Sequence, residues 1–251
     1  MEWRDDGLVI GARRHGESSV ILEVMTAAHG RHLGLVRGGR SRRMQPVLQA
    51  GNGIEAVWRA RIDEHLGMMT VEATRNRAAR LMQSQVALHG LSWLGQLLHL
   101  LPEREPHPRL YETAVLVCDH LDEPAIAPAL MVRFELALLQ ELGFGLDLSE
   151  CAATGATQEL VYVSPKSGRA VCRAAGLPWH GKLLALPGFL QEGARGEVAG
   201  ADLADGFRLT GHFLARDLFG PRGGEVPQAR ADFVRLAAVR TESLADHDPL
   251  N

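Results

Sequence analysis

The sequence predicts an α+β protein in which a small five-stranded barrel precedes a helical domain that carries a β-hairpin insertion. Three observations support this prediction. The first 75 residues alternate short apolar runs with turn residues, the apolar spacing becomes helical from residue 78 onward, and that spacing is lost between 151 and 181. With 251 residues, 46% of them hydrophobic and 23% charged, the chain can bury one large core or two modest ones.

Runs rich in Val and Ile, with alternating apolar positions, predict five strands in the N-terminal part. They cover residues 8–13, 18–25, 31–36, 53–61 and 68–74. Residues 26–30 are expected to form a hairpin loop in which Gly30 adopts a positive φ, because glycine has no Cβ to oppose it. Closing so short a sheet removes its exposed edges, and the five-stranded OB-fold is the common solution at this size. We therefore expect an OB-fold domain over residues 1–79.

Apolar residues at three- and four-residue spacing predict helices in the remainder of the chain. The predicted helices cover residues 78–101, 110–121, 129–142, 187–190, 207–219 and 228–240. The third is apolar on most sides and is expected in a core, with Gly143 ending it as a C-cap glycine. Segments 160–163 and 170–172 flank turn residues and predict a small β-hairpin. We expect a helical domain over 80–247, with 151–185 as the hairpin insertion and a frayed tail at 246–251.

Composition favours a soluble protein of the cytoplasm. Acidic residues stand near the N-terminus where a signal peptide would carry basic ones, and no apolar run reaches the length of a membrane span. Three cysteines, Cys118, Cys151 and Cys172, are too few and too scattered for a disulfide framework. We therefore expect a protein that is neither secreted nor bound to a membrane.

No catalytic motif is present in the sequence. The patterns G-x-S-x-G and H-E-x-x-H do not occur, and no G-x-G-x-x-G follows the first strand. Residues 176–182 match the start of a phosphate-binding loop, but Leu183 stands where Ser or Thr would hold magnesium, and Pro178 removes an amide. Two pairs with metal-like spacing lack the further ligands that a structural zinc needs, namely His29 with His32 and Cys118 with His120. The sequence thus favours a binding protein over an enzyme.

The remaining feature is a concentration of arginine in the N-terminal part. The chain has a net charge of −3, but residues 1–80 hold 13 Arg and 9 acidic residues, a balance of +4. Guanidinium groups pair bidentately with phosphate oxygens, so the pattern favours nucleic-acid binding. Arg59 and Arg61, two apart, are expected on one face of the fourth strand. The candidate nucleic-acid-binding residues are Arg13, Arg14, Arg31, Arg37, Arg40, Arg42, Arg43, Arg59 and Arg61.

Aromatic residues that could stack on bases are sparse in this part of the chain. Trp3 and Trp58 are the only candidates, and Trp58 fits a core position equally well. Sequence-specific readout is therefore not expected.

Several motifs resemble the RecO family of recombination mediators. In the N-terminal part they are GLVI at 7–10, GESS at 16–19, TAAHGR at 26–31 and RGGR at 37–40. Further along they are RFELALL at 133–139 and LGF at 142–144. The resemblance covers most of the chain and weakens after residue 187. It implies an OB-fold that binds DNA, followed by a helical domain.

The resemblance also implies a function without bond making or breaking. Members bind single- and double-stranded DNA, anneal complementary strands and, with RecR, help load the RecA recombinase onto DNA coated with single-strand-binding protein. The helical domain would contact the acidic, hydrophobic C-terminal tail of that protein, and Arg133 is the candidate residue. Alternatively, Arg133 forms an internal ion pair with Glu135 or another local acid. An OB-fold RNA-binding or ribosome-associated protein shares the charge argument and is the alternative function.

The sequence departs from this family at one chemically important place. Many members resemble one another in carrying C-x-x-C twice around the hairpin, as a zinc knuckle. Here the corresponding segments read CAAT at 151–154 and CRAA at 172–175, so only Cys151 and Cys172 remain. Two thiolates do not hold a structural zinc, and we expect no metal or other cofactor. The hairpin is then expected to be held by packing of Val161, Val163 and Val171.

Overall fold

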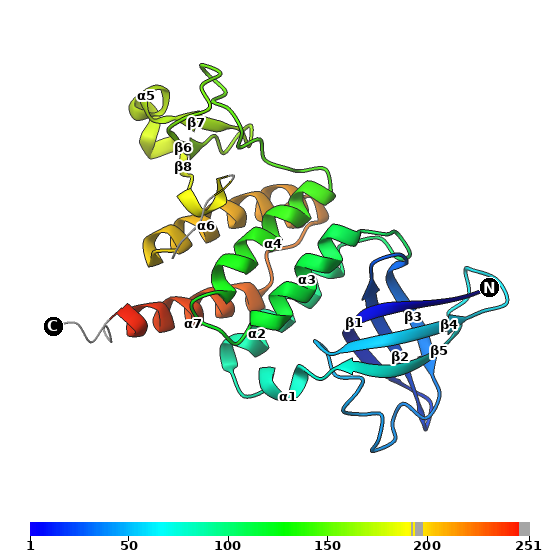
Figure 1. Ribbon diagram of the computed structural model, residues 1–251. Coiled ribbons are helices and arrows are strands. Elements are labelled where there is room, and N and C mark those ends of the chain that lie inside the picture. Colours follow the sequence, from blue (N-terminus) through cyan, green and yellow to red (C-terminus); the bar gives the residue numbers. More distant parts are fainter. Residues whose placement is uncertain (192, 194–197, 246–251) are drawn as a thin grey trace. The chain divides into compact units, whose positions relative to one another are not determined.

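The computed structural model of the chain describes residues 1–191, 193 and 198–245 (Figure 1). The chain forms two compact units, residues 1–122 and 123–251, which are described separately below. The expected domain boundary near residue 80 falls inside the first unit. The segment 246–251, expected to be frayed, lies outside the described residues.

The first unit contains the predicted five-stranded barrel (Figure 1). The strands are β1 (Glu2–His15), β2 (Ser19–Thr26), β3 (Gly30–Val36), β4 (Gly53–Arg59) and β5 (Met68–Arg75). They close in the order β1-β2-β3-β5-β4, with antiparallel pairs except for β3 and β5, which are parallel. The OB-fold prediction is confirmed. Strand β1 begins earlier than predicted because its polar first half pairs with β4, whereas its second half pairs with β2.

Trp58 fills the barrel interior. Its side chain is fully buried, and its indole N–H donates to the carbonyl of Leu66 at 2.9 Å. Gly67, at φ +66°, lies so close that a Cβ there would stand 2.4 Å from the indole nitrogen. Gly30 has the predicted positive φ, +61°, and also packs against the backbone of Glu105. Both glycines are therefore required by backbone conformation and by space.

A buried polar network connects the barrel to the helices that follow it in the first unit. The Asn52 side chain accepts hydrogen bonds from the backbone N–H groups of Arg77 and Ala78 at 2.8 and 2.9 Å, and donates to the carbonyl of Pro46 at 2.7 Å. The Arg77 guanidinium donates to Asp119 at 2.6 Å and holds the pKa of that carboxyl below its usual value. These bonds fix where the helical part begins.

The predicted helix over 78–101 is wrong as a single element. The chain forms α1 (Ala78–Leu81) and α2 (Gln85–Leu98), followed by α3 (Pro108–His120). The break occurs because the Ser84 hydroxyl accepts the Ala87 N–H and starts α2 as an N-cap residue. The apolar spacing continues through this break, so periodicity alone did not reveal it.

The second unit contains the helices α4 (Ala127–Glu141), α6 (Gly200–Phe213) and α7 (Gln228–Ala245). A π-helix, η3 (Leu214–Phe219), continues α6. The fully buried Glu135 of α4 receives two hydrogen bonds from the Arg230 guanidinium of α7, at 2.8 and 3.0 Å, and one from the Thr210 hydroxyl of α6. A buried charge needs such a partner, so this group joins three helices in one arrangement.

The predicted insertion also lies in the second unit. The strands β6 (Leu160–Val163) and β7 (Ala170–Cys172) form the predicted hairpin, and β8 (Leu184–Ala185) adds a third, unpredicted strand. Between β7 and β8 lie α5 (Arg173–Gly176) and the 3-10 helix η1 (Leu177–Lys182). The remaining 3-10 helices are η2 (Gly188–Leu190) and η4 (Gly220–Arg222). Val163 and Val171 are buried and Val161 is half-buried, as expected for a hairpin held by packing.

Within the described residues, no helix has the combined length and hydropathy that a membrane-spanning segment requires.

Candidate nucleic-acid interface

Strand register gathers several of the predicted arginines at one end of the barrel. Arg14 of β1 and Val36 of β3 both lie opposite Val20 of β2, so Arg37 emerges at the same end of the barrel as the last residues of β1, with β2 between them. The connection after β3 folds back onto the β1–β2 turn, where the Arg40 N–H donates to the carbonyl of Ser18 at 3.1 Å. OB-folds bind nucleic acids with the face of strands 2 and 3 and the loops after β1 and β4. The gathered arginines border the first of these loops.

Five arginines at this end are exposed and make no hydrogen bond or ion pair with the part of the chain that the structure describes. They are Arg13, Arg14, Arg37, Arg42 and Arg43. Arg40 differs, because its guanidinium donates to the carbonyls of Gly16 and Glu17 at 3.2 and 2.6 Å. Arg40 therefore positions the loop on which Arg42 and Arg43 are carried.

Arg59 and Arg61 border the other loop of the OB-fold, between β4 and β5. They line a groove of about 580 Å³ together with Leu35, Ala60, His65, Leu66, Gly67 and Met68. The expectation that both lie on one strand face is wrong, because β4 ends at Arg59 and Arg61 lies in the bend beyond it. Arg59 pairs with Glu2 at 2.8 Å, but both side chains are more than half exposed, and such surface pairs contribute little.

Arg31 lies at the opposite end of β3 and is held internally. Its side chain is 14% exposed and donates to Glu23 at 2.5 Å and to the carbonyl of Leu101 at 3.1 Å. His99 contacts the other oxygen of Glu23 at 2.8 Å. Burial would raise the pKa of Glu23, but the hydrogen bonds from His99 and Arg31 outweigh burial and lower it. Arg31 thus links β2 and β3 to the segment after α2. It is therefore not part of the proposed interface.

The aromatic residues of the barrel are engaged with one another. The Trp3 ring is stacked on His29 at a centroid distance of 4.3 Å and on Trp58 at 5.9 Å. His32 meets both tryptophans edge-on, at 5.0 and 4.8 Å. These rings form part of the barrel's own packing, so the interface offers charge and not stacking surfaces.

His32 gives the barrel a built-in sensitivity to acid. It is 2% exposed, and neither ring nitrogen has a hydrogen-bond partner among the described residues. Burial, with additional repulsion from Arg104 and His29, lowers its pKa to about 4. The unfolded chain therefore binds a proton at this histidine between about pH 6.5 and 4, whereas the folded chain does not.

We expect the free energy of unfolding to fall by about 3 kcal/mol from this residue as the pH is lowered from 7 to 4. Urea unfolding at a series of pH values measures the fall, and His32→Phe should remove this contribution. His15→Phe, which changes an exposed histidine of the same barrel, is the control and should keep the wild-type pH dependence. An unchanged slope in His32→Phe would contradict this role.

The two remaining cysteines of the hairpin lie together. The Cys172 N–H donates to the Cys151 sulfur at 3.2 Å, and the Thr154 hydroxyl lies 3.6 Å from the Cys172 sulfur. Burial would raise the pKa of Cys151, but hydrogen bonds from Cys172, Thr154 and Ala153 lower it to about 6. Two sulfurs and a hydroxyl do not fit a tetrahedral zinc, and the described residues contain no group of three or more metal-ligating side chains. We propose that hydrogen bonds and packing hold this hairpin without zinc.

Restoring the two missing thiolates should create a metal site. The double substitution Thr154→Cys with Ala175→Cys is expected to bind one zinc per chain and to raise Tm when zinc is added, because ligation stabilises the folded state. Metal analysis and thermal unfolding measure both effects. The matched control, Thr154→Ser with Ala175→Ser, should bind none. Stoichiometric zinc in the wild-type protein would contradict the proposal.

Arg133 lies exposed on α4 next to an apolar residue. Its guanidinium donates to the carbonyl of Phe189 at 2.9 Å and lies 5.9 Å from the ring of that residue. The alternative of a pair with Glu135 is not what the structure shows, since Glu135 is held by Arg230 and Thr210. The Phe189 ring is itself buried, so this site offers an incoming ligand the exposed Arg133 cation, which suits an acidic group.

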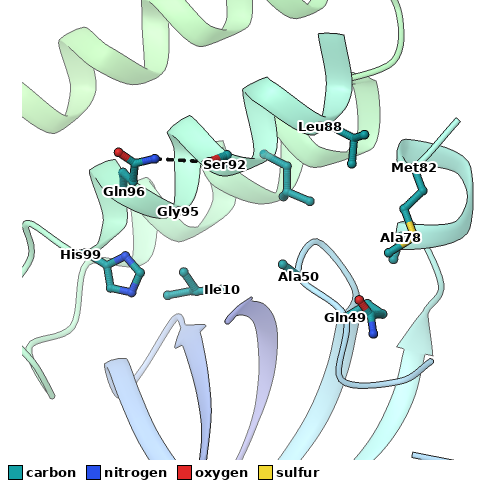
Figure 2. A pocket seen from close by; sticks show the side chains of 11 residues that line it. Ile10, Gln49, Ala50, Ala78, Met82, Leu88, Ser92, Gly95, Gln96 and His99 are labelled. Carbon is teal, nitrogen blue, oxygen red and sulfur yellow. Dashed lines mark hydrogen bonds between the residues drawn. The ribbon is translucent and has the colours of Figure 1, made fainter. Parts of the chain in front are cut away.

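The first unit also contains a pocket between the barrel and the helices that follow it. It measures about 430 Å³ and lies where Ile10 and Ala50 of the barrel face α1 and α2 (Figure 2). Its polar lining residues are Gln49, Ser92, Gln96 and His99. Gln96 donates to Ser92 at 3.2 Å, and His99 is paired with Glu23. This lining contains no nucleophile activated by a neighbouring base.

Comparison with known proteins matches both parts of the chain to one family. The family model described as recombination protein O N terminal matches residues 1–77, and that described as recombination protein O C terminal matches residues 86–224. This chain belongs to the recombination protein O family.

Similar curated proteins carry the name DNA repair protein RecO. The protein of Methylobacterium nodulans is 61% identical over 243 residues, covering 95% of this chain and 99% of its own length. The protein of Sinorhizobium medicae is 59% identical over 248 residues, covering 97% and 98%. The protein of Chelativorans is 59% identical over 239 residues, covering 95% and 96%. The likeness therefore extends over both units.

Proposed function

We propose that this protein is a DNA repair and recombination mediator that binds single- and double-stranded DNA and anneals complementary strands. The observation that carries the proposal is the group of exposed arginines without acidic partners at one end of the barrel. Membership of the recombination protein O family supports the same role. The proposed DNA-contacting residues are Arg13, Arg14, Arg37, Arg42, Arg43, Arg59 and Arg61, with Arg40 positioning the loop.

Annealing requires that phosphate repulsion between two strands be screened while the bases stay accessible. Arginines that hold phosphates and ignore base edges meet this requirement. Because Trp3 and Trp58 are engaged inside the barrel, bound bases at this end remain free to pair. No covalent bond forms or breaks in this process, so the role needs no catalytic residue.

Partner binding is assigned to the second unit in this proposal. Arg133, which is exposed beside the buried Phe189, would receive the acidic C-terminal tail of single-strand-binding protein. With RecR, the protein would then help RecA assemble on coated DNA in the cytoplasm. An acidic peptide gains a charge-assisted hydrogen bond from the exposed guanidinium.

The salt dependence of binding tests the barrel interface. Each phosphate contact to single-stranded DNA contributes about 0.7 to the slope of log affinity against log salt, so the five unpartnered arginines together with Arg61 predict a slope near −4. Replacing Arg37, Arg42 and Arg43 by alanine should flatten this slope by about 2. Fluorescence anisotropy with a labelled oligonucleotide at several salt concentrations measures it.

A matched control removes the same charge elsewhere. Arg109, Arg208 and Arg235 are exposed and lie outside the barrel, and their alanine variant should keep the wild-type slope. Equal slopes in the two triple variants would show that net charge, and not this surface, governs binding.

The annealing activity itself is tested on DNA coated with single-strand-binding protein. The wild type should accelerate pairing of complementary coated strands, and the Arg37, Arg42 and Arg43 variant should lose most of the acceleration. Failure of the wild type in this assay, with tight binding to RNA, would instead support the RNA-binding alternative.

Arg133→Ala should weaken binding of a peptide with the tail sequence by about tenfold or more, since a hydrogen bond to a charged group contributes about 1.5–3 kcal/mol. Anisotropy of a labelled peptide measures the loss. Arg208→Ala, an exposed arginine of α6, serves as the control and should bind normally. Normal binding by Arg133→Ala would remove this residue from the peptide site.

A further inference from the structure

The segment from β6 to η2 has an unusual charge composition. Residues 160–191 contain four Lys or Arg and no Asp or Glu, and they include both lysines of the chain, Lys166 and Lys182. The surrounding sequence is acidic, since residues 81–251 hold 14 basic and 21 acidic residues, a balance of −7. Residues 160–191 are therefore a basic island in the acidic C-terminal two thirds of the chain.

Two of these four basic residues are engaged with acids. Arg169 pairs with Asp147 and Glu150 at 3.2 and 2.9 Å, and Arg173 lies 3.8 Å from Glu159. Lys166 and Lys182 have no acidic partner in the described part of the chain. Leu184 of β8 lies opposite Val163 of β6, so Lys182 approaches the end of the sheet whose turn carries Lys166. The two available ammonium groups thus belong to one end of this small sheet.

Trp179 is exposed on η1 beside these charges. It is 58% exposed, and the Lys182 ammonium lies 5.6 Å from the centroid of its ring. The base of η1 is fixed, because Gly176 packs so tightly on Tyr162 that a Cβ there would stand 2.4 Å from the ring. The His180 ring also bonds to the carbonyl of Leu177 at 3.0 Å. An aromatic ring is therefore presented to solvent from a well-anchored short helix.

The other three tryptophans are not available in this way. Trp58 and Trp93 are fully buried, and Trp3 is stacked on His29 and Trp58. Exposing an indole costs free energy that burial would recover, so a ring left in water next to unpartnered lysines points to a ligand with flat apolar groups and negative charge. Single-stranded nucleic acid has both, and stacking on an aromatic side chain contributes about 1–3 kcal/mol per base.

We propose that Trp179 and Lys182, with Lys166 nearby, form a second contact for single-stranded DNA. The indole stacks on one unpaired base, and the two ammonium groups neutralise flanking phosphates. This inference rests on the proposed function, because it assigns a further part of the chain to the same ligand. It differs from the barrel surface in selectivity: bases in a duplex are already stacked on one another, so this contact serves single strands alone.

The experiment compares Trp179→Ala with Trp179→Phe in the full chain. Trp179→Ala should weaken binding to a labelled oligo(dT) by roughly 5- to 150-fold, the range that corresponds to loss of one stacked base. Trp179→Phe keeps a flat ring and should remain close to wild type. Binding to a hairpin-free duplex should change by less than about twofold in both variants, because no unpaired base is offered there.

Leu177→Ala is the matched control, since Leu177 is 62% exposed on the same short helix but has no ring. It should bind oligo(dT) as the wild type does. A second readout uses oligo(dT) in which thymine is replaced by 5-bromouracil: irradiation should crosslink the oligonucleotide to Trp179 in the wild type.

The outcomes separate this inference from the function on which it rests. If the wild type binds neither single strands nor duplex, the proposed function fails. If the wild type binds both, and Trp179→Ala binds oligo(dT) equally well without a crosslink at residue 179 in the wild type, only the second contact is overturned. Equal weakening of duplex and single-strand binding in Trp179→Ala would also overturn it.

Discussion

Closure of the barrel is the constraint on which the candidate interface depends. The parallel pairing of β3 with β5 brings Leu35 opposite Met68, and the Leu35 N–H donates to the carbonyl of Gly67 at 3.0 Å. Without this closure, the loop after β4 would be separated from the end of β3. With it, arginines carried by the end of β1, by the connection after β3 and by the end of β4 and its following loop border one end of the barrel. The buried Trp58, enclosed by Gly67, keeps that closure in a single arrangement.

The environment of each arginine, more than its presence, decides what it can do. Arg31 pairs with Glu23 in a partly buried site and also donates to the carbonyl of Leu101, so it holds parts of the fold together. The Arg40 guanidinium donates hydrogen bonds to main-chain carbonyls and thereby holds the loop in its conformation. Arg42 and Arg43, on that same loop, have no acid within reach in the described chain, so phosphate is their natural partner. The barrel thus contains arginines that hold its own strands and loops in place and other arginines that are available to bind phosphate.

Local patterns predicted most of the elements, and non-local contacts account for the differences. The strands β2 and β3, the hairpin of β6 and β7, and the positive φ of Gly30 follow from residues adjacent in the sequence. The first half of β1 could not be predicted in this way, because its polar residues form a strand only through pairing with β4. Likewise, the acids that hold Arg31 lie on another strand and beyond α2, at positions no local spacing reveals. The basic island at 160–191 is a local property of the sequence that the net charge of −7 over residues 81–251 conceals.

The two proposed DNA contacts recognise different chemical groups and therefore act at different stages of annealing. Phosphates are present in single strands and in duplex alike, so the arginines of the barrel retain DNA before and after pairing. An unpaired base is present only before pairing, so a stack on Trp179 is lost when the complementary strand arrives. One stacked base contributes about 1–3 kcal/mol, whereas each base-pair step of a growing duplex contributes about 1.4 kcal/mol. A single such contact therefore favours single strands at the start and yields to the duplex after a few paired bases.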